Sequence, residues 1–181
     1  MSLVTIGTNA EALERDLDAA VTGEVRFDKV SRALYSTDAS VYQILPLGVV
    51  VPRTREDLVA AVMTAAKHRC SVTLRGGGTS QAGQAIGDGI QIDISKYYNR
   101  VLEVNAAERW CRVEPGIVLA ELNAQLKAHG LLFAPDVSAS SRARRAANQG
   151  GRTAFGKRMP ERRRNSAAFN ATIRTRPSFS P

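Results

Sequence analysis

The chain has 181 residues, 44% of them hydrophobic, which suits one ordinary domain with a core of useful size. Its formal net charge is +8, but residues 142–181 hold 11 lysines and arginines against one acidic residue, so the excess belongs to the C-terminal segment. Two cysteines without metal-ligand spacing argue against a disulfide framework or a zinc site, and no apolar run is long enough for a membrane span, so we expect a cytoplasmic protein.

The N-terminal segment, residues 1–46, is predicted to be a helical lead-in to the first clear strand. Leu13 and Leu17 recur at helical spacing, and an irregular stretch follows. The β-branched run 47–51 is stopped by Pro52 and is typical of a strand buried on both faces. We therefore place a domain boundary at residue 47.

A helix with a capping box is predicted after this strand. Thr54 is its N-cap, and Asp57, three residues on, is the capping partner. The apolar stripe of the helix is predicted to comprise Leu58, Val62 and Ala66. The run 71–74 then predicts a second strand, so these elements form a βαβ unit with parallel strands and a right-handed crossover.

The residues after position 89 are predicted to form an antiparallel part with one helix. Isoleucines alternate with polar residues over 90–94, and the runs 100–104 and 109–114 follow, the last two joined by a hairpin turn. A helix begins near Val118 and ends at Gly130, which supplies the C-terminal cap. The predicted fold class is α+β, a small parallel βαβ subdomain followed by an antiparallel sheet with helices.

A glycine-rich loop leaves the carboxyl end of the second predicted strand. Six glycines occur among the fourteen residues 76–89, which indicates positive φ angles or a close approach of the backbone to another group. Two well-known phosphate loops do not fit, because a dinucleotide fingerprint requires glycine at Gln81 and a P-loop requires lysine at Gln84. Another phosphate-binding loop and a tight turn at a sheet corner both stay open.

Four segments, taken in order, resemble a known family. They are 37–58 (TDASVYQILPLGVVVPRTREDL), 74–95 (LRGGGTSQAGQAIGDGIQIDIS), 112–136 (RVEPGIVLAELNAQLKAHGLLFAPD) and 138–143 (SASSRA). Over residues 36–143 the chain resembles the amino-terminal part of the FAD-binding domain of the vanillyl-alcohol oxidase/PCMH superfamily. It is most similar to the branch of 2-hydroxy-acid dehydrogenases, which includes glycolate oxidase subunits and D-lactate and D-2-hydroxyglutarate dehydrogenases.

The resemblance implies a PCMH-type FAD-binding fold and an oxidoreductase that oxidises a small 2-hydroxy acid by hydride transfer to FAD, with an electron acceptor that the sequence does not identify. The residues that match cofactor-binding positions of the family are Pro52, Arg75, Gly76, Gly77, Gly78, Thr79, Ser80, Gly83, Pro135, Asp136, Ser138 and Ser141. In this family the glycine-rich turn wraps the pyrophosphate, and its backbone N–H groups can form an anion nest. Members that link FAD covalently here carry histidine where this chain has Thr79, so non-covalent FAD is implied.

Some of these residues have ordinary structural roles as alternatives. Pro52 also fits a residue that simply ends a strand, and the pair 135–136 also fits a turn after a strand. His68 and His129 are near predicted helix ends and receive no catalytic role. In the family the substrate is handled largely by a later substrate domain, so no catalytic residue is assigned in this chain.

The resemblance breaks after Ala143, where Arg144 and Arg145 replace a glycine-rich continuation of the family pattern. The interpretation we favour is a partial FAD-binding domain over 47–143 and a basic, disordered or out-of-frame tail over 144–181, with no dehydrogenase activity in this chain alone and no nucleic-acid partner. The alternative is a nucleotide-binding module without catalysis whose basic arm binds RNA or DNA through phosphate contacts.

Overall fold

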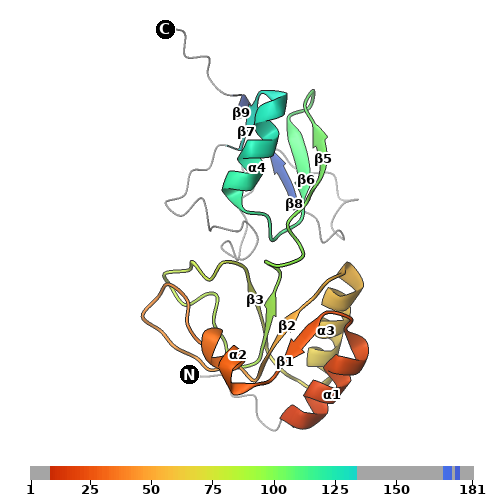
Figure 1. Ribbon diagram of the computed structural model, residues 1–181, viewed down its shortest axis with the longest axis vertical. Coiled ribbons are helices and arrows are strands. Elements are labelled where there is room, and N and C mark those ends of the chain that lie inside the picture. Colours follow the sequence, from red (N-terminus) through yellow and green to blue (C-terminus); the bar gives the residue numbers. More distant parts are fainter. Residues whose placement is uncertain (1–8, 134–168, 173, 176–181) are drawn as a thin grey trace.

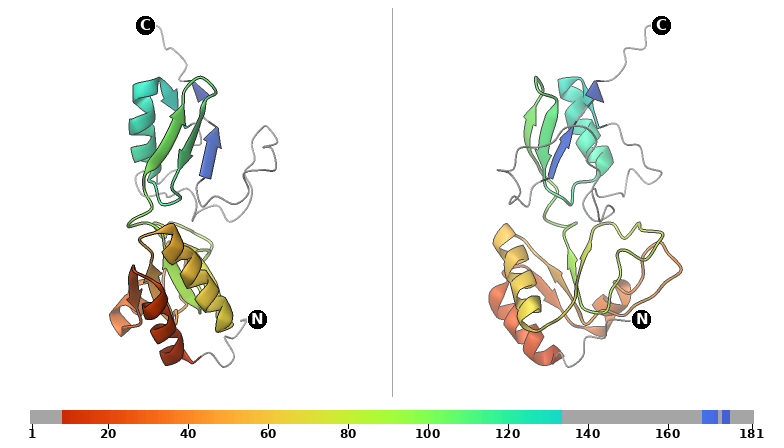
Figure 2. Two further views of the ribbon diagram at one scale, coloured as in Figure 1. Left: turned by 90° about the vertical axis from the view of Figure 1, so that its right-hand side faces the viewer. Right: turned by 180° about the vertical axis from the view of Figure 1, so that it is seen from behind.

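The computed structural model describes residues 9–133, 169–172 and 174–175. They form two lobes that are stacked along the longest axis of the molecule (Figure 1). The first lobe is built from residues 9–94, and the second from residues 101–133 with the two short C-terminal stretches. The two further views in Figure 2 keep this separation, so the chain passes from one lobe to the other through the segment after residue 94.

The N-terminal helix α1 (Ala10–Ala20) begins where the sequence supplies a cap. The side chain of Asn9 accepts a hydrogen bond from the backbone N–H of Ala12 at 3.1 Å, which satisfies one of the free donors of the first turn. Leu13 and Leu17 lie one turn apart and are fully buried. The helical spacing of the leucines therefore predicted the buried face of α1 correctly.

The lead-in contributes a strand as well as helices. The strand β1 (Glu24–Arg26) follows α1 and pairs with the first predicted strand, and the helix α2 (Lys29–Leu34) follows β1. The side chain of Asp28 caps α2 by accepting from the N–H of Ser31 at 2.8 Å. Residues before position 47 thus form part of the same sheet as the residues after it.

The first lobe contains a four-stranded sheet in the order β1-β2-β4-β3. Its other strands are β2 (Gly48–Val51), β3 (Val72–Arg75) and β4 (Ile90–Asp93). Strand β4 lies between β2 and β3 and is parallel to both, whereas β1 is antiparallel to β2. The predicted parallel direction of the first two strands is confirmed, but the two are not neighbours.

The prediction that residues 90–94 belong to the antiparallel part is wrong. Residues 90–93 form β4, the middle one of the three parallel strands, and all four are buried. The alternating polar residues suggested one solvated face, yet Gln91 is 0% exposed and Asp93 is 8% exposed. In the orientation that matches its neighbours, the side-chain amide of Gln91 donates to the carbonyl of Ala85 and accepts from the N–H of Gly87, both at 3.1 Å. These two hydrogen bonds satisfy the buried polar side chain inside the sheet.

Helix α3 (Arg55–Lys67) begins with the predicted capping box. The hydroxyl of Thr54 accepts from the N–H of Asp57 at 3.1 Å, and the carboxylate of Asp57 accepts from the N–H of Thr54 at 3.2 Å. Both residues of the motif therefore satisfy donors at the start of the helix.

The predicted apolar stripe of α3 is only partly correct. Leu58 packs against the core, but Val62 and Ala66 are exposed, and Ala61 and Ala65 are fully buried in their place. The helix carries apolar residues around most of its circumference, so periodicity left the buried face undetermined. The small alanine side chains let α3 approach its neighbours closely.

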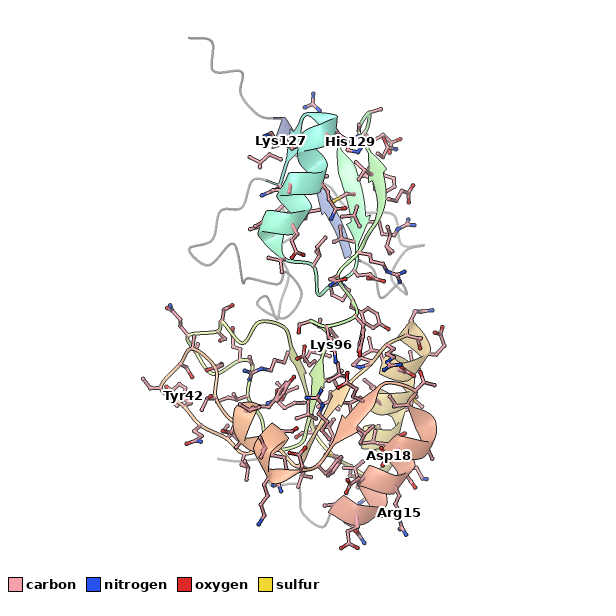
Figure 3. The ribbon with its side chains drawn as sticks, in the orientation of Figure 1. Arg15, Asp18, Tyr42, Lys96, Lys127 and His129 are labelled. Carbon is pink, nitrogen blue, oxygen red and sulfur yellow. The ribbon has the colours of Figure 1, made fainter. Side chains whose placement is uncertain are left out.

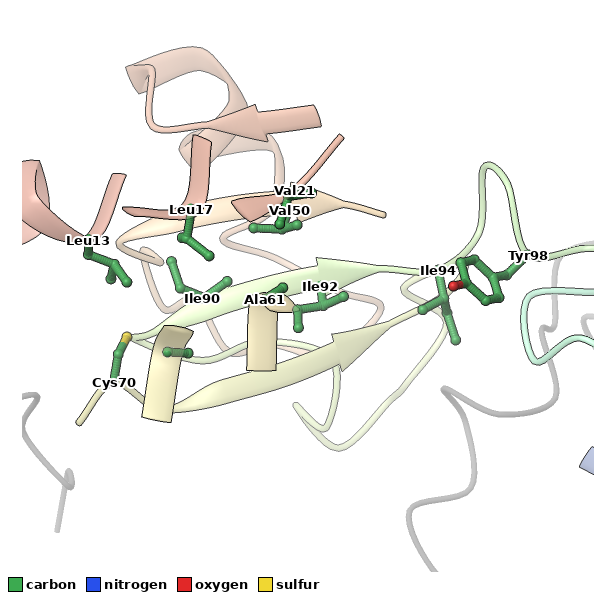
Figure 4. Close-up of a cluster of buried hydrophobic side chains, with 11 residues drawn as sticks. Leu13, Leu17, Val21, Val50, Ala61, Cys70, Ile90, Ile92, Ile94 and Tyr98 are labelled. Carbon is green, nitrogen blue, oxygen red and sulfur yellow. The ribbon is translucent and has the colours of Figure 1, made fainter. Parts of the chain in front are cut away.

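Helices α1 and α3 pack side by side and form the core of the first lobe together with the sheet (Figures 2 and 4). The buried members of this core are Leu13, Leu17, Val21, Val50, Ala61, Ala65, Cys70, Ile90, Ile92, Ile94 and Tyr98. At the surface, the carboxylate of Asp16 on α1 accepts from Lys67 at 3.0 Å and lies 2.8 Å from a ring nitrogen of His68. His68 therefore joins two helices.

The second lobe begins with the predicted antiparallel hairpin of β5 (Val101–Asn105) and β6 (Trp110–Val113). Helix α4 (Leu119–Leu126) buries its leucines against this hairpin and continues as the short 3-10 helix η1 (Lys127–His129). Gly130 follows with a φ of +66° and ends the helix in the left-handed conformation, as predicted.

Two stretches of the basic segment pair with the second lobe. Strand β8 (Phe169–Thr172) is antiparallel to β6, and β9 (Arg174–Thr175) is antiparallel to β7 (Leu131–Leu132). The rest of the predicted tail over 144–181 lies outside the described residues, so the expectation for the tail as a whole stays a prediction.

The passage between the lobes is fixed by close backbone packing and by an ion pair between Arg100 and Glu114. A Cβ on Gly116 would lie 2.1 Å from the carbonyl oxygen of Ile94 and 2.4 Å from that of Tyr98, so only glycine fits there. The carboxylate of Glu114 accepts from the backbone N–H of Arg100 at 2.9 Å and from its guanidinium at 2.8 Å. Within the part of the chain that the structure describes, no helix has the length and apolar character of a membrane span.

Candidate functional site

The glycine-rich loop is the connection between two neighbouring parallel strands. It leaves β3 at Arg75, so its first part lies at the carboxyl edge of the sheet on the side of the second lobe (Figure 1), and it enters β4 at Ile90, at the opposite edge. Such a connection has to cross from one end of the sheet to the other and normally contains a helix. Here it is an irregular loop, and its first part lies where open α/β sheets bind ligands.

Two glycines of the loop have backbone conformations that other residues rarely adopt. Gly78 has a φ of +63° and Gly83 a φ of +71°. A Cβ on Gly78 would lie 2.5 Å from the guanidinium of Arg75, and one on Gly83 would lie 3.0 Å from the ring of Tyr42. Both positions therefore favour glycine by conformation, and a side chain there would also displace Arg75 or press on Tyr42.

The segment 36–44, which precedes β2 in the chain, holds the loop in place. The N–H of Ala39 donates to the carbonyl of Gly78 at 3.0 Å, and a carboxylate oxygen of Asp38 accepts from the N–H of Ala85 at 3.3 Å. Tyr42 lies at the outer edge of this segment in Figure 3. The two stretches therefore support each other at the edge of the first lobe.

Ser80 gives the loop its internal shape. Its side chain is 7% exposed, and its hydroxyl oxygen accepts from the N–H of Ala82 at 3.3 Å and from the N–H of Gln84 at 3.1 Å. A hydroxyl that accepts from the backbone two and four residues on stabilises a turn. Ser80 is thus committed to the loop itself in this conformation.

A polar cavity of about 440 Å³ lies at the same edge of the sheet, at the carboxyl ends of β2 and β4. Its lining residues are Arg26, Tyr35, Val51, Asp93, Ser95, Lys96, Asn99 and Glu121. Glu121 comes from α4, so the cavity is bounded by both lobes, and Figure 3 places Lys96 between them. A cavity with side chains of both charges suits a polar ligand rather than an apolar one.

Two of the charged side chains that line this cavity, Arg26 and Lys96, pair with Glu24. Glu24 accepts from Lys96 at 2.5 Å and from the hydroxyl of Tyr97 at 2.8 Å, and it also pairs with Arg26. The hydrogen bonds from Lys96 and Tyr97 outweigh the effect of burial and lower the pKa of Glu24 to about 2. Glu24 is therefore ionised throughout the neutral range and connects β1 with the passage between the lobes.

Sequence comparison identifies the family. A family sequence model described as an FAD binding domain matches residues 46–151, which is more than half of the chain. The chain belongs to this family of FAD-binding domains. The match continues to residue 151, eight residues past the point at which the resemblance was expected to break.

Relatives of this FAD-binding domain include two D-2-hydroxyglutarate dehydrogenases. The protein from Pseudomonas putida is 43% identical over 136 residues, covering 74% of this chain and 14% of the relative. The protein from Escherichia coli is 44% identical over 125 residues, covering 67% and 12%. The glycolate oxidase subunit GlcD of Bacillus subtilis is 29% identical over 122 residues, covering 65% and 26%. This FAD-binding domain thus spans only a small part of each relative.

Solved structures share the fold of this FAD-binding domain. An alkyldihydroxyacetonephosphate synthase aligns with a TM-score of 0.65 at 22% identity, over 75% of this chain and 28% of the other. A p-cresol methylhydroxylase aligns with a TM-score of 0.62 at 16% identity, over 76% and 27%. The expected PCMH-type α+β fold is confirmed by these neighbours.

The structure places eight of the twelve predicted cofactor-binding residues. Seven of them lie together at the end of β3 and in the first part of the glycine-rich loop: Arg75, Gly76, Gly77, Gly78, Thr79, Ser80 and Gly83. Pro52 is buried directly after β2, next to the cavity residue Val51. The other four, Pro135, Asp136, Ser138 and Ser141, lie outside the described residues.

The residues that support the loop were not predicted from the sequence. Asp38 and Tyr42 belong to a segment that stood out only by its resemblance to the family, and Tyr35 lies just before it. Residues 35–43 include two tyrosines and several polar residues. This composition does not indicate a contact with a loop some forty residues later in the chain.

The cysteines and the possible metal-ligating side chains among the described residues form no second site. Cys70 and Cys111 are buried and form no disulfide, and burial raises the pKa of the Cys70 thiol. Across residues 9–133 and the two C-terminal strands, no group of His, Cys, Asp and Glu side chains has the arrangement of a metal site.

Proposed function

We propose that this chain binds FAD without a covalent link and that the pyrophosphate lies against backbone N–H groups of the loop 75–83. The proposal is carried by one observation: a glycine-rich connection, with positive φ at Gly78 and Gly83, sits at the carboxyl edge of a parallel sheet. Glycines at such positions can direct successive N–H groups into one concavity, and a doubly charged group fits it without side-chain interference.

The residues present are suited to this cofactor. Gly77 is exposed and Thr79 half-buried, so the turn has an accessible backbone and a hydroxyl nearby. Thr79 replaces the histidine that covalent members of the family carry, which supports non-covalent binding. The family resemblance adds a second stretch to the proposed cofactor contacts, which comprises Pro135, Asp136, Ser138 and Ser141.

We further propose that the complete protein oxidises a small 2-hydroxy acid, with D-2-hydroxyglutarate as the first candidate. The relatives named D-2-hydroxyglutarate dehydrogenase are 42–44% identical, whereas those named glycolate oxidase subunit or D-lactate dehydrogenase are 29–31% identical. Bound FAD would accept the hydride in this chemistry. The described residues contribute the anchor for the cofactor, and no electron acceptor is assigned. Two cysteines that form no disulfide support a cytoplasmic location.

The test of the proposal is a titration with FAD, followed by flavin fluorescence, on two matched variants. Gly78→Ala forces a side chain into a positive-φ position and against Arg75, and should weaken FAD binding by about tenfold or more. Gly130→Ala imposes the same kind of backbone strain at φ +66° in the second lobe, where a Cβ meets nothing within 4 Å. It should leave FAD affinity unchanged. Equal affinities of both variants and the wild type would refute the loop as the binding site.

The alternative of a nucleic-acid-binding module rests on the 11 basic residues of 142–181. Salt-sensitive retention on heparin, together with no binding of FAD, would favour that alternative because phosphate contacts of lysine and arginine weaken with salt. Yellow protein with flavin absorbance after purification would support the flavin function.

A further inference from the structure

The glycine-rich loop is closed at its far end by the peptide units around Ala85. Ala85 is 1% exposed. Its N–H donates to Asp38 at 3.3 Å, and its carbonyl accepts from the guanidinium of Arg75 at 3.1 Å. Arg75 is the last residue of β3, directly before the loop, so its side chain bridges the start of the loop and its return.

The guanidinium of Arg75 is enclosed by the loop and by Tyr35. It lies over the Tyr35 ring at 5.1 Å from the centroid, with a long contact of 3.5 Å to the Tyr35 carbonyl. On its other side it occupies the space that a Cβ on Gly78 would need. A planar group fits between a ring and a backbone turn, whereas an ammonium on a flexible stem cannot make the same set of contacts.

Tyr35 is in turn fixed by the central strand. Its hydroxyl donates to Asp93 at 2.6 Å, and Asp93 also accepts from the N–H of Ser95 at 2.7 Å. Burial, followed by the hydrogen bond to Asp93, raises the pKa of Tyr35, so the phenol stays a neutral donor. The support under Arg75 therefore extends to the carboxyl end of β4.

Asp38 is ionised and accepts a hydrogen bond from the backbone N–H of Ala85. Burial acts to raise its pKa, but hydrogen bonds from Ser40 and Ala85 and the nearby charge of Arg75 outweigh it and lower the pKa. One carboxylate oxygen accepts from the N–H of Ser40 at 2.9 Å and the other from that of Ala85. The segment 36–44 is thereby joined to the loop by a charged group.

We propose that Arg75 and Asp38 are positioning residues that close the glycine-rich loop before the cofactor binds, and that Arg75 acts through the shape of its guanidinium and not as a cation on the pyrophosphate. The part that concerns FAD rests on the function proposed above. The family resemblance placed Arg75 among cofactor-binding residues, and the contacts in this structure commit its guanidinium to the loop.

Two variants of Arg75 separate the two roles. Arg75→Lys keeps the charge and removes the planar fork, and Arg75→Gln removes both. A positioning role predicts that both weaken FAD binding to a similar extent, by about tenfold or more, since each removes the guanidinium that donates to the Ala85 carbonyl and lies over the Tyr35 ring. Arg15→Lys, on the exposed surface of α1, is the matched control and should bind FAD like the wild type.

The second measurement is amide hydrogen exchange in the protein without FAD. Faster exchange at Ala82, Gln84 and Ala85 in both Arg75 variants and in Asp38→Asn, with unchanged exchange in α1, supports loop closure by these side chains. Unchanged exchange, with Arg75→Lys keeping most of the wild-type affinity and Arg75→Gln losing it, would identify Arg75 as a phosphate ligand and overturn the proposal. Should the wild type bind no FAD, the proposed function fails, while the exchange data still decide whether these residues close the loop.

Discussion

Replacing Asp57 by alanine is expected to destabilise the first lobe far more than the removal of an exposed charge does. Asp57 is only 3% exposed and accepts hydrogen bonds from three backbone N–H groups. These belong to Thr22 at 2.8 Å, Arg53 at 2.9 Å and Thr54 at 3.2 Å, and the Thr22 hydroxyl donates as well at 3.0 Å. One carboxylate thus joins the turn after α1 to the start of α3.

The size of the effect follows from these contacts. Loss of the hydrogen bond from the N–H of Thr54, by which Asp57 completes the capping box, costs about 1 kcal/mol. The N–H groups of Thr22 and Arg53 lose their acceptor in partly buried turns and add about 1 kcal/mol each, at the lower end of the usual cost of an unsatisfied donor. The expected decrease in the free energy of unfolding is therefore about 3 kcal/mol.

Urea unfolding followed by circular dichroism measures this decrease. Glu56→Ala is the matched control, because it removes an exposed acidic residue from the same helix turn. Equal midpoints for Asp57→Ala and Glu56→Ala would refute the reasoning.

The carboxylate of Asp57 also makes the stability of the first lobe depend on pH. Burial acts to raise the pKa of Asp57, but the hydrogen bonds from Thr22 and Arg53 outweigh it, and the pKa is lowered on folding. Its contribution is then fully present above about pH 4, the pKa of an unfolded aspartate, and is lost as the pH falls through the lower pKa of the folded state. The stability difference between the wild type and Asp57→Asn should therefore decrease below about pH 4.

Three further results are expected. The carboxyl group of Glu24 should titrate near pH 2 in NMR spectra, and Lys96→Met should raise that midpoint because it removes the main hydrogen-bond donor. Tyr98→Phe should keep or increase the free energy of unfolding, by up to about 1 kcal/mol, because the buried hydroxyl of Tyr98 has no partner among the described residues; a clear loss in thermal unfolding would contradict this. Gly116→Ala should lower the melting temperature, since its Cβ would press on the carbonyl of Ile94, and an unchanged melting temperature would show that the passage between the lobes is not tightly packed.

Local signals in the sequence predicted much of the fold. The capping box at Thr54, the hairpin turn before Trp110 and the helix end at Gly130 each depend on a few adjacent residues, and all three are present. The glycine-rich loop was found in the same way, because its conformation is a property of its own backbone. The cofactor-binding roles of residues 75–83 came from the family resemblance and stay a prediction.

Features that depend on distant residues were not predictable in this way. The central place of β4 is a matter of strand order, and the alternation of isoleucine with Gln91 and Asp93 concealed its burial on both faces. Asp38 reaches Ala85 across 47 positions of sequence, and no periodicity reports such a contact. Helix α3 shows the same limit, because an almost uniformly apolar helix does not indicate which face meets α1.

The strand order of the first lobe has a consequence for how the protein forms during synthesis. β4 is the last of the four strands to leave the ribosome, yet it supplies the hydrogen bonds that join β2 to β3. Until residue 93 has emerged, the earlier strands can pair only as the antiparallel β1–β2 ribbon, and the glycine-rich connection has no second end to attach to. Assembly of the sheet and closure of the loop are therefore one late, long-range event, of the kind that makes β-rich proteins fold slowly.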